Sequence, residues 1–442
     1  MKKRESRISM NYEGIYQQYM YSYPHKTAYR KIEPRSIEQY KPLLRKQKNS
    51  LYFHIPFCES KCGYCNLFSV TGQKETFISD YLDACLRQIE QYAMRDIVFS
   101  DLTIGGGTPI LLSNRQLERL FGMVKSGFGW EEEPPIVIET APNQTTWEKL
   151  CVLKENKVTR VSIGVQSFCQ EELEQLCRHH TVKQTREAIR LLKQAGFGCL
   201  NLDLIYGIKG QTLETLRYSL EEALSYEPDE LFIYPLYIKS GTILDRKQEK
   251  ASDSRYTFYC FIRDFLDSRG YHQSSMRRFV STKSGTAEIQ PASDCGFENT
   301  ISIGCGGRSY IGNVHFCTPY GVKQTTCQRI LNDYMQCHDY GNIDYGFVLS
   351  EEEMRRRYVM KNLLSCRGIF FQEYRDQFGS DVVKDYEILQ GFLKKDYLLL
   401  EGERLYLSRE GMALSDFIGP CLISEEVRQR MSEWKDTYGE YD

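Results

Sequence analysis

Short β-branched runs alternate with amphipathic helical stretches between residues 50 and 250 of this chain. The β-branched runs predict six strands, at Leu51–Ile55, Leu102–Ile104, Ile136–Glu139, Arg160–Ile163, Leu200–Ile205 and Leu231–Pro235. Apolar residues recur with the helical period between them, which predicts helices at Phe77–Ala93, Arg115–Lys125, Trp147–Asn156, Thr185–Ala195 and Leu213–Leu224. Alternating strands and helices imply a parallel sheet. Since a closed barrel of this type has eight units, the pattern predicts an α/β fold with a partial (β/α)6 barrel.

The remaining chain divides into three further regions by its pattern. Residues 1–48 are polar and rich in Tyr, Lys and Arg, and they predict an N-terminal arm before the barrel at 49–250. Residues 251–345 predict a barrel extension with Gly-rich loops, mostly without regular structure from Met276 to Tyr320. The pattern of residues 346–442 predicts a small, mostly helical, winged-helix-like domain. Its hairpin is expected at Tyr397–Glu401 and Arg404–Leu407, and its helices at Glu351–Ser365, Gln372–Phe378, Tyr386–Lys394 and Ser408–Phe417.

Three cysteines follow the first predicted strand with the spacing C-x3-C-x2-C. They are Cys58, Cys62 and Cys65. Three thiolates on one loop hold three corners of a cubic iron–sulfur cluster, which normally takes four ligands, so one iron is left open to a cofactor. The alternative is a structural zinc site, which usually takes four ligands, often from two C-x2-C pairs. The chain has no second such pair, which favours the cluster.

Polar or glycine-rich residues follow the other predicted strands. Gly105-Gly106-Gly107-Thr108-Pro109 follows the second strand and lacks the Gly-Lys-Ser/Thr of a phosphate-binding loop. The next strands lead to Glu139, to Gly164-Val165-Gln166, to Asp203 and to Tyr237. Ligands of such barrels bind at the carboxyl ends of the strands, so these segments predict one common site. Asp203 stands among apolar residues and needs a partner, which a ribose hydroxyl, an amine or Arg178 would supply.

Composition limits the partners and the compartment. The chain has 442 residues and a formal net charge of −2, which gives no electrostatic footprint for nucleic acid. No apolar run is long enough to cross a bilayer, and no signal peptide is evident. We therefore expect a cytoplasmic protein with no membrane partner, whose sixteen cysteines stay reduced.

Other cysteines and histidines leave two minor alternatives open. Five cysteines recur at intervals of ten or twelve residues, which permits a second cluster, although buried thiols of the core are favoured: Cys295, Cys305, Cys317, Cys327 and Cys337. His179, His180 and His315 are candidate metal ligands or proton donors, but surface or packing roles are favoured for each.

These motifs together resemble those of radical S-adenosylmethionine (SAM) enzymes. The resemblance rests on His54-Ile55-Pro56-Phe57-Cys58 with Cys62 and Cys65, and on Gly105–Pro109, Gly164–Phe168 and Asp203–Gly207. Within that superfamily the chain is most similar to the oxygen-independent coproporphyrinogen III oxidase-like (HemN-like) family. The resemblance implies that the partial barrel is a radical SAM barrel, and that the cofactors are a 4Fe–4S cluster and one or two molecules of SAM.

The resemblance also implies roles for individual residues. Cys58, Cys62 and Cys65 would ligate the cluster, and Tyr64 would lie near the adenine of SAM. Tyr52, Gly106 and Glu139 would contact the SAM on the open iron. Positions that contact a second SAM in the porphyrinogen oxidases are matched by Gly107, Thr108, Gln166, Arg178, Asp203 and Tyr237.

The function implied is radical chemistry on an unidentified small-molecule substrate. An external one-electron donor, such as flavodoxin or ferredoxin, would reduce the cluster, and SAM would yield a 5′-deoxyadenosyl radical that abstracts hydrogen. Coproporphyrinogen oxidation, radical methyl transfer and haem delivery by a chaperone are the alternatives.

Two departures separate the chain from known branches of this family. Porphyrinogen oxidases carry a further cysteine where this chain has Leu67, which argues against coproporphyrinogen as the substrate. The haem chaperones carry a distal segment with a histidine, and the corresponding Ser275-Met276-Arg277-Arg278-Phe279 has none, which argues against haem delivery.

Overall fold

Six parallel strands form the centre of one sheet, as the sequence predicts. The structure is a computed structural model that describes residues 14–283 and 299–438. Within these residues the sheet has 13 strands, in the order β1-β17-β16-β15-β14-β2-β6-β8-β9-β10-β11-β13-β12. The six central strands pair in parallel and in chain order. They are β2 (Asn49–Ile55), β6 (Asp101–Gly106), β8 (Ile136–Thr140), β9 (Arg160–Gln166), β10 (Cys199–Tyr206) and β11 (Glu230–Pro235).

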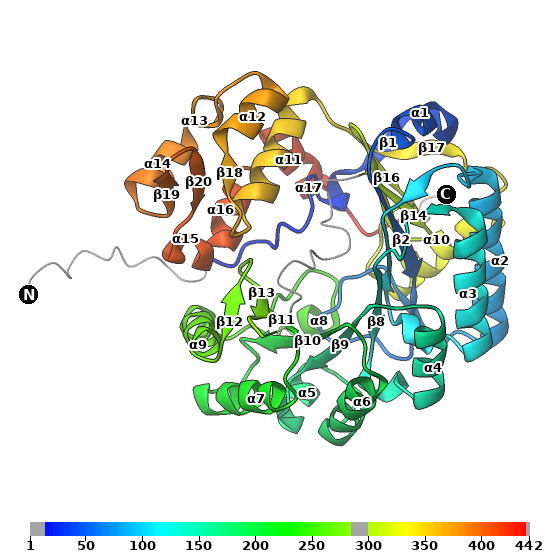
Figure 1. Ribbon diagram of the computed structural model, residues 1–442, viewed down its shortest axis with the longest axis horizontal. Coiled ribbons are helices and arrows are strands. Elements are labelled where there is room, and N and C mark those ends of the chain that lie inside the picture. The colour runs from blue at the N-terminus through cyan, green and yellow to red at the C-terminus, as the bar shows by residue number, and fades with distance from the viewer. Residues whose placement is uncertain (1–13, 284–298, 439–442) are drawn as a thin grey trace, which may run out of the picture.

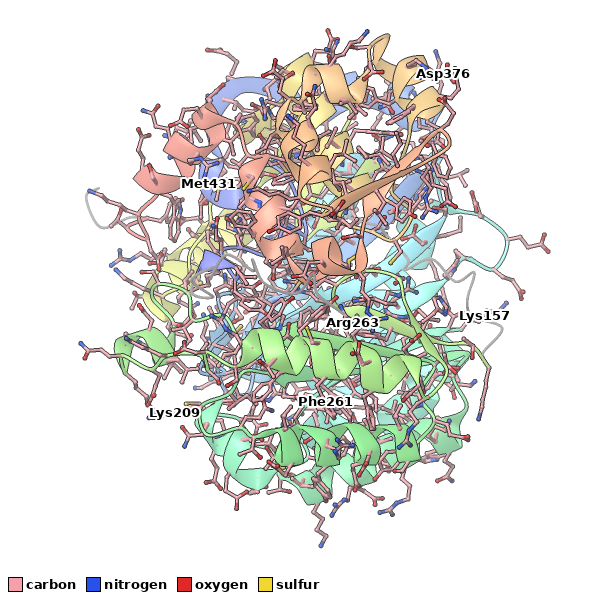
Figure 2. All side chains as sticks on the ribbon, turned by 90° about the vertical axis from the view of Figure 1, so that its left-hand side faces the viewer. Lys157, Lys209, Phe261, Arg263, Asp376 and Met431 are labelled. Carbon is pink, nitrogen blue, oxygen red and sulfur yellow. The ribbon has the colours of Figure 1, made fainter. Side chains whose placement is uncertain are left out.

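Helices cover the outer face of these strands, as in a barrel that has not closed (Figure 1). Five of them lie within a few residues of the predicted positions: α2 (Glu75–Tyr92), α3 (Asn114–Gly127), α4 (Trp147–Glu155), α6 (Val182–Ala195) and α7 (Leu213–Ser225). The other two are α5 (Gln170–Gln175) and α9 (Arg255–Asp267). Local sequence sets these bounds, since α6 begins at a capping box of Thr181 with Gln184 and ends at Gly196 in a left-handed conformation. Figure 2 shows Phe261 between α9 and α7, where the Arg217 guanidinium lies 4.8 Å from its ring centre.

The prediction of mostly irregular structure from Met276 to Tyr320 is wrong in part. Four strands occur there: β13 (Arg278–Ser281), β14 (Asn299–Ile303), β15 (Arg308–Ile311) and β16 (Val314–Cys317). They extend the sheet on both sides, with β13 antiparallel to β11 and β14 parallel to β2. Each strand is only four or five residues long, and all five residues of β14 are buried, so no alternation of apolar and polar residues marks it.

Further short elements complete this part of the molecule. β1 (Arg30–Ser36), from the predicted arm, pairs with β17 (Asn342–Val348), and β17 crosses the predicted boundary at residue 345. The limits of the domains stay a prediction. The remaining elements are β3 (Phe57–Cys58), β4 (Val70–Thr71), β5 (Val98–Phe99), β7 (Gly129–Trp130), β12 (Tyr271–Gln273), α1 (Lys41–Leu44), α8 (Ile243–Arg246) and α10 (Gln324–Gln336).

The C-terminal part is mostly helical and contains the predicted hairpin, to which the structure adds a third strand that the sequence analysis did not predict. The sheet has the order β18-β20-β19, from β18 (Ile369–Phe370), β19 (Leu398–Glu401) and β20 (Arg404–Leu407). The helices are α11 (Glu351–Leu363), α12 (Phe371–Phe378), α13 (Val382–Asp385), α14 (Ile388–Lys394), α15 (Arg409–Ala413), α16 (Ser415–Cys421) and α17 (Glu425–Glu433). The single helix predicted at Ser408–Phe417 is divided in two at Leu414.

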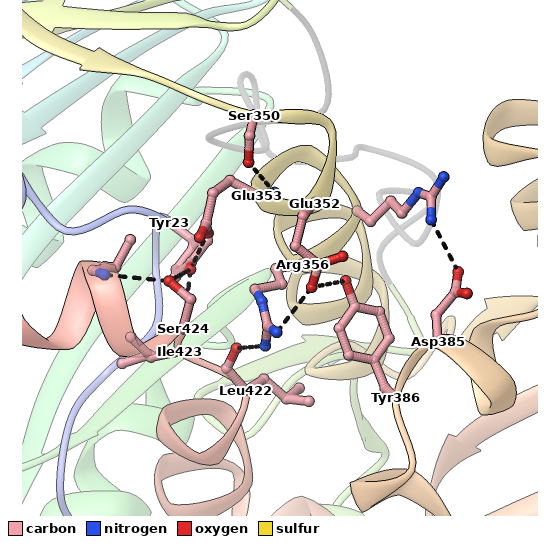
Figure 3. Close-up of polar contacts among 12 residues, drawn as sticks. Tyr23, Ser350, Glu352, Glu353, Arg356, Asp385, Tyr386, Leu422, Ile423 and Ser424 are labelled. Carbon is pink, nitrogen blue, oxygen red and sulfur yellow. Dashed lines mark hydrogen bonds and ion pairs between the residues drawn. The ribbon is translucent and has the colours of Figure 1, made fainter.

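The N-terminal arm runs along these C-terminal helices (Figure 1). Figure 3 shows the contact at Tyr23, whose hydroxyl donates to the Glu353 carboxylate of α11 and accepts from the backbone N–H of Ser424 at 3.3 Å. In the same figure Arg356 donates to the Leu422 carbonyl oxygen at 3.0 Å. The Tyr23 bonds join the N-terminal arm to the C-terminal part, and the Arg356 bond joins two elements within that part.

Two findings bear on the expectations from composition. None of the helices in the described ranges is both long and apolar enough to cross a membrane. The described cysteines are all free thiols. Cys305 and Cys327 are buried and donate to the carbonyl oxygens of Ile330 and Gly321, so they act as core thiols, and Cys295 lies outside the described residues.

A buried ion cluster joins three strands at the amino-terminal end of the barrel. The Glu230 side chain of β11 is fully buried, and one of its oxygens accepts from Nε and Nη2 of Arg160 of β9 at 3.0 and 2.7 Å. Its other oxygen pairs with Arg278 of β13. One carboxylate therefore forms ion pairs with two guanidinium groups that are themselves almost buried.

We expect Glu230→Ala to lower the free energy of unfolding by about 3–5 kcal/mol, because it removes the buried carboxylate that forms ion pairs with both guanidinium groups. Denaturant unfolding followed by circular dichroism measures the change. Glu221→Ala, at an exposed position of α7, is the matched control and should stay within about 0.5 kcal/mol of wild type. Equal stability of the two variants would contradict this account of the ion cluster.

Candidate functional site

A cavity of about 580 Å³ lies at the carboxyl ends of the central strands. This is the face on which barrels of this type hold their ligands. Every central strand from β6 to β11 contributes to its wall near its carboxyl end: Gly106, Gly107, Thr108, Glu139, Thr140, Ser162, Gly164, Gln166, Asp203, Ile205, Tyr234 and Pro235. The predicted convergence of these segments on one site is therefore seen in the structure.

The three cysteines of the motif line this cavity together. Backbone bonds hold their loop: Cys65 N–H donates to the Cys62 carbonyl at 3.2 Å, and Gly63 N–H donates to the Leu176 carbonyl at 2.8 Å. Burial raises the pKa of Cys58 to about 12, with a further contribution from the negative charge of Cys65. The Cys58 thiol therefore stays protonated at neutral pH until a metal displaces the proton.

The donor set fits an iron–sulfur cluster better than a single metal ion. Among the residues that the structure describes, no three His, Cys, Asp or Glu side chains approach closely enough to share one ion. Three thiols that bind three different irons of a cluster need no such approach, whereas the ligands of one zinc do. Arg178 donates to Cys62 Sγ at 2.8 Å, and Thr108 donates to Cys58 Sγ at 3.7 Å, so the protein also supplies hydrogen bonds to the sulfurs.

The glycine loop after β6 lies directly against the cysteine loop. Gly107 N–H donates to the Ile55 carbonyl at 2.7 Å, and a side chain at Gly107 would meet the Phe57 carbonyl oxygen at 2.6 Å. Gly106 has φ of 120°, and a side chain there would meet the buried His54 ring at 2.7 Å. The glycines are therefore required by the close approach of the two loops.

Glu139 and Asp203 are the acids of the site. The Glu139 carboxylate accepts from Gly106 N–H at 3.1 Å, and its side chain is exposed within the cavity. Desolvation raises the pKa of Glu139 to about 7, with a smaller contribution from Asp203. Desolvation also raises the pKa of Asp203 to about 6. Neighbours on the same strands hold Asp203, namely Asn201 at 2.8 Å and Ser162 at 3.2 Å.

Arg178, one of the partners predicted for Asp203, contacts other groups in the structure. Its side chain donates to Cys62 Sγ and to the Gly164 carbonyl oxygen at 2.9 Å, and no hydrogen bond to Asp203 is present. Gln166 lies close by in a left-handed conformation, with φ of 70°. Arg178 thus joins the cysteine loop to the end of β9.

Tyr64 and Tyr237 also line the cavity, whereas Tyr52 does not. The Tyr237 hydroxyl donates to Asp416 of α16 and accepts from Arg277 at 3.0 Å. The Tyr52 hydroxyl lies 3.1 Å from His54 Nδ1, in the layer beneath the cavity. Apart from Tyr52, the predicted cluster ligands and cofactor contacts all line the cavity, and the role of each of them, Tyr52 included, stays a prediction.

The predicted histidines lie in two places. His179 and His180 line the cavity, and His180 Nε2 lies 3.3 Å from the Val165 carbonyl oxygen. Burial lowers the pKa of His180 to about 3, so this ring is neutral. His315 is fully buried with its ring against Tyr310 at 4.5 Å between centroids, in agreement with a packing role.

Aromatic residues outside the barrel form the part of the wall that sequence reasoning missed. They come from the arm, from the segment before α10 and from the C-terminal end: Tyr19, Tyr21, His25, Tyr320 and Trp434. The rings of Tyr320 and Trp434 lie 5.1 Å apart, and the Lys26 ammonium lies 3.7 Å from the centre of the Tyr320 ring. No motif marks these positions, and only the high tyrosine content of the arm points to them.

A partial barrel with a three-cysteine loop at the carboxyl ends of its strands defines a radical SAM protein. The family model described as "Radical SAM superfamily" matches residues 52–223, and "HemN C-terminal domain" matches residues 349–414. The HemN structure of Escherichia coli superimposes with a TM-score of 0.75 at 21% identity, covering 87% of this chain and 93% of that chain.

Curated relatives carry two different names. "Heme chaperone HemW" of Escherichia coli is 30% identical over 65% of this chain and 75% of its own length. "Heme chaperone HemW" of Lactococcus lactis is 25% identical over 86% of this chain and 98% of its length. "Oxygen-independent coproporphyrinogen III oxidase" of Pseudomonas aeruginosa is 26% identical over 87% of this chain and 88% of its length.

The chain belongs to the HemN- and HemW-containing family of the radical SAM superfamily. Membership implies a 4Fe–4S cluster and SAM as cofactors. The three thiols and the glycine loop around one cavity fit both groups.

We expect Gly106→Ala to weaken SAM binding at least tenfold. The added Cβ meets the His54 ring and displaces the backbone N–H from which Glu139 accepts a hydrogen bond. Calorimetry on the anaerobic, cluster-loaded protein measures the affinity. Gly122→Ala is the matched control, since this α3 glycine has nothing within 4 Å of the added Cβ. An unchanged affinity in Gly106→Ala would show that this loop does not form the SAM subsite.

Proposed function

We propose that this protein is a radical SAM enzyme that acts on a small-molecule substrate. When bound, the cluster supplies the electron that cleaves SAM to methionine and the 5′-deoxyadenosyl radical, which takes hydrogen from the substrate. The observation that carries the proposal is the single cavity in which Cys58, Cys62 and Cys65 face the glycine loop and Glu139. Family membership supports the same chemistry.

The protein's own residues bind and orient the cofactor. Cys58, Cys62 and Cys65 would bind three irons of the cluster as thiolates, and the hydrogen bond from Arg178 holds Cys62 in place. Glu139 uses one oxygen for Gly106 N–H and has the other for the ammonium group of SAM.

Residues further along the cavity support the binding of a second SAM. Asp203, held by its strand neighbours, accepts from a ribose hydroxyl or an amine. Other predicted contacts line the same continuous cavity: Gly107, Thr108, Gln166, Arg178 and Tyr237. A second molecule would be held between these residues and the aromatic wall, where radical methyl transfer also becomes possible.

Haem delivery is the second candidate, because several relatives are named haem chaperones. The segment that corresponds to their distal motif is used differently in this chain. Arg277 forms a buried ion pair with Asp416, and Arg278 pairs with Glu230. Neither side chain is an iron ligand, and both are held in place, so the segment supports an enzyme more than a haem carrier.

Coproporphyrinogen oxidation receives support from the oxidase relatives and less from the site. Leu67, at the position of the additional cysteine, lines the cavity and is 44% exposed. An apolar side chain there donates no hydrogen and binds no iron. The substrate therefore stays open within the proposed radical chemistry.

The test is anaerobic reconstitution with iron and sulfide followed by reaction with dithionite and SAM. We expect about four irons per chain and formation of 5′-deoxyadenosine. Cys62→Ser should lose both, since a hydroxyl is a poor ligand for iron in such clusters. Cys151→Ser, a half-buried cysteine on α4 outside the site, should retain both.

Haem titration distinguishes the second candidate. Full iron content without any SAM cleavage, together with stoichiometric haem binding and transfer to an apo-haemoprotein, would overturn the enzyme proposal and support the chaperone. Iron content near one per chain, or zinc in its place, would overturn the cluster itself.

The pKa of Glu139 predicts a pH-dependent affinity for SAM. The ammonium group of SAM binds the ionised carboxylate, and the pKa of about 7 means that Glu139 loses this charge as the pH falls. We expect affinity to fall about tenfold from pH 8 to pH 6. Glu139→Gln should bind SAM weakly and independently of pH. Calorimetry in matched buffers makes the comparison, and a pH-independent wild type would refute the assigned role of Glu139.

A further inference from the structure

The outer side of the cysteine loop is covered by a thin layer of the protein. Gly63, between Cys62 and Tyr64, accepts from Leu244 N–H of α8 at 2.8 Å. A side chain at Gly63 would meet the Leu244 side chain at 2.9 Å and Cys177 Sγ at 3.1 Å. The first turn of α8 and the residues between α5 and α6 therefore lie directly on the loop, opposite the cavity.

Three cations follow Leu244 on the outward side of this layer. Arg246, Lys247 and Lys250 are exposed, and none forms an ion pair with a residue of the described chain. Lys247 Nζ lies 3.6 Å from Cys177 Sγ, which places its charge next to the layer over the loop. We call these three residues the α8 basic segment.

The two acids of the same stretch, Asp245 and Glu249, offset only part of the charge of these three cations. Asp245 accepts from Gly241 N–H at 2.9 Å within its own turn. Glu249 pairs with Lys209 at 2.9 Å. Because the whole chain has a net charge of −2, the excess of positive charge here is local.

The other side of the cysteine loop is not free for electron entry. The loop lines the cavity there, and in the proposed function SAM and the substrate fill that space. Electron transfer weakens steeply with distance, so a reductant must approach where the covering layer is thin. The α8 basic segment is at such a place.

We propose that the α8 basic segment is the docking surface for an acidic one-electron carrier protein that reduces the cluster. The proposal rests on the proposed function, since only a protein that consumes the electron needs repeated reduction. One electron passes from the reduced carrier to the oxidised cluster, the carrier is oxidised by one electron, and no bond forms or breaks. Exposed unpaired cations steer an acidic partner over long range and fix its orientation.

The test uses the full-length, cluster-loaded protein and reduced flavodoxin as the acidic carrier. Cluster reduction is followed by its visible absorbance in an anaerobic stopped-flow instrument at low salt. We expect the variant R246E/K247E/K250E to be reduced at least about tenfold more slowly than wild type. R246Q/K247Q/K250Q should be intermediate. The difference should vanish near 1 M salt, where the screening length is about 3 Å.

The control carries the same change of charge at the amino-terminal ends of the strands. K46E/R95E/K157E replaces three exposed cations that precede β2, β5 and β9. Figure 2 shows Lys157 on the opposite side of the molecule from Lys209, the partner of Glu249. This variant should be reduced by flavodoxin as fast as wild type.

Reduction by dithionite separates the two proposals. Dithionite is small and needs no docking surface, so R246E/K247E/K250E should match wild type in dithionite-driven reduction and 5′-deoxyadenosine formation. Equal rates with flavodoxin for both triple variants and wild type at low salt would overturn the docking proposal. A cluster that dithionite reduces without any SAM cleavage in wild type would instead overturn the proposed function.

Discussion

The parallel pairing of β2 with β6 is the constraint on which the site depends. Its register sets His54 opposite Gly105 and Ile55 opposite Gly106, and it continues past the strands in the bond from Gly107 N–H to Ile55. The cysteine loop and the glycine loop therefore leave the sheet side by side, at a spacing that only glycine permits. A slip by one residue would turn every following side chain to the other face of the sheet. The acids of β8 and β10 then join the same cavity because parallel strands end at one edge.

A second constraint closes the cavity from outside the barrel. Asp416 of α16 forms a buried ion pair with Arg277 and accepts a hydrogen bond from the Tyr237 hydroxyl. It therefore joins the C-terminal part to the cavity wall. The Arg277 guanidinium also lies 3.8 Å from the centre of the Tyr19 ring, which belongs to the arm. Because loss of one partner would leave a buried charge without compensation, these three regions hold their positions together. The arm and the C-terminal helices are thus part of the site and not appendages to the barrel.

The sequence predicts the inner part of this molecule well because its signals are local. Each central strand is a short apolar run between helical patterns, and each carries its chemical residue at its end. The outer strands have no such local signal. β1 pairs with β17, which follows about three hundred residues later in the sequence, and β14 follows the central strands in the sequence but pairs with the first of them, β2. The same limit applies to the site. Motif residues were found, whereas Tyr320 and Trp434 were missed, because their contact is created only by the tertiary fold.

This division between local and tertiary signals also explains why relatives with one fold carry different names. A chaperone and an oxidase match this chain over similar shares of its length and at similar identity. The match of both relatives extends over most of the chain, so overall similarity does not separate the two names. The wall that faces the strand ends of the barrel comes from the arm and the C-terminal end, with Tyr21, His25 and Trp434. In the proposed function a substrate lies between the cofactor and this wall, and the wall residues would then select it. Under that proposal the chemistry and the specificity are encoded in different parts of the chain.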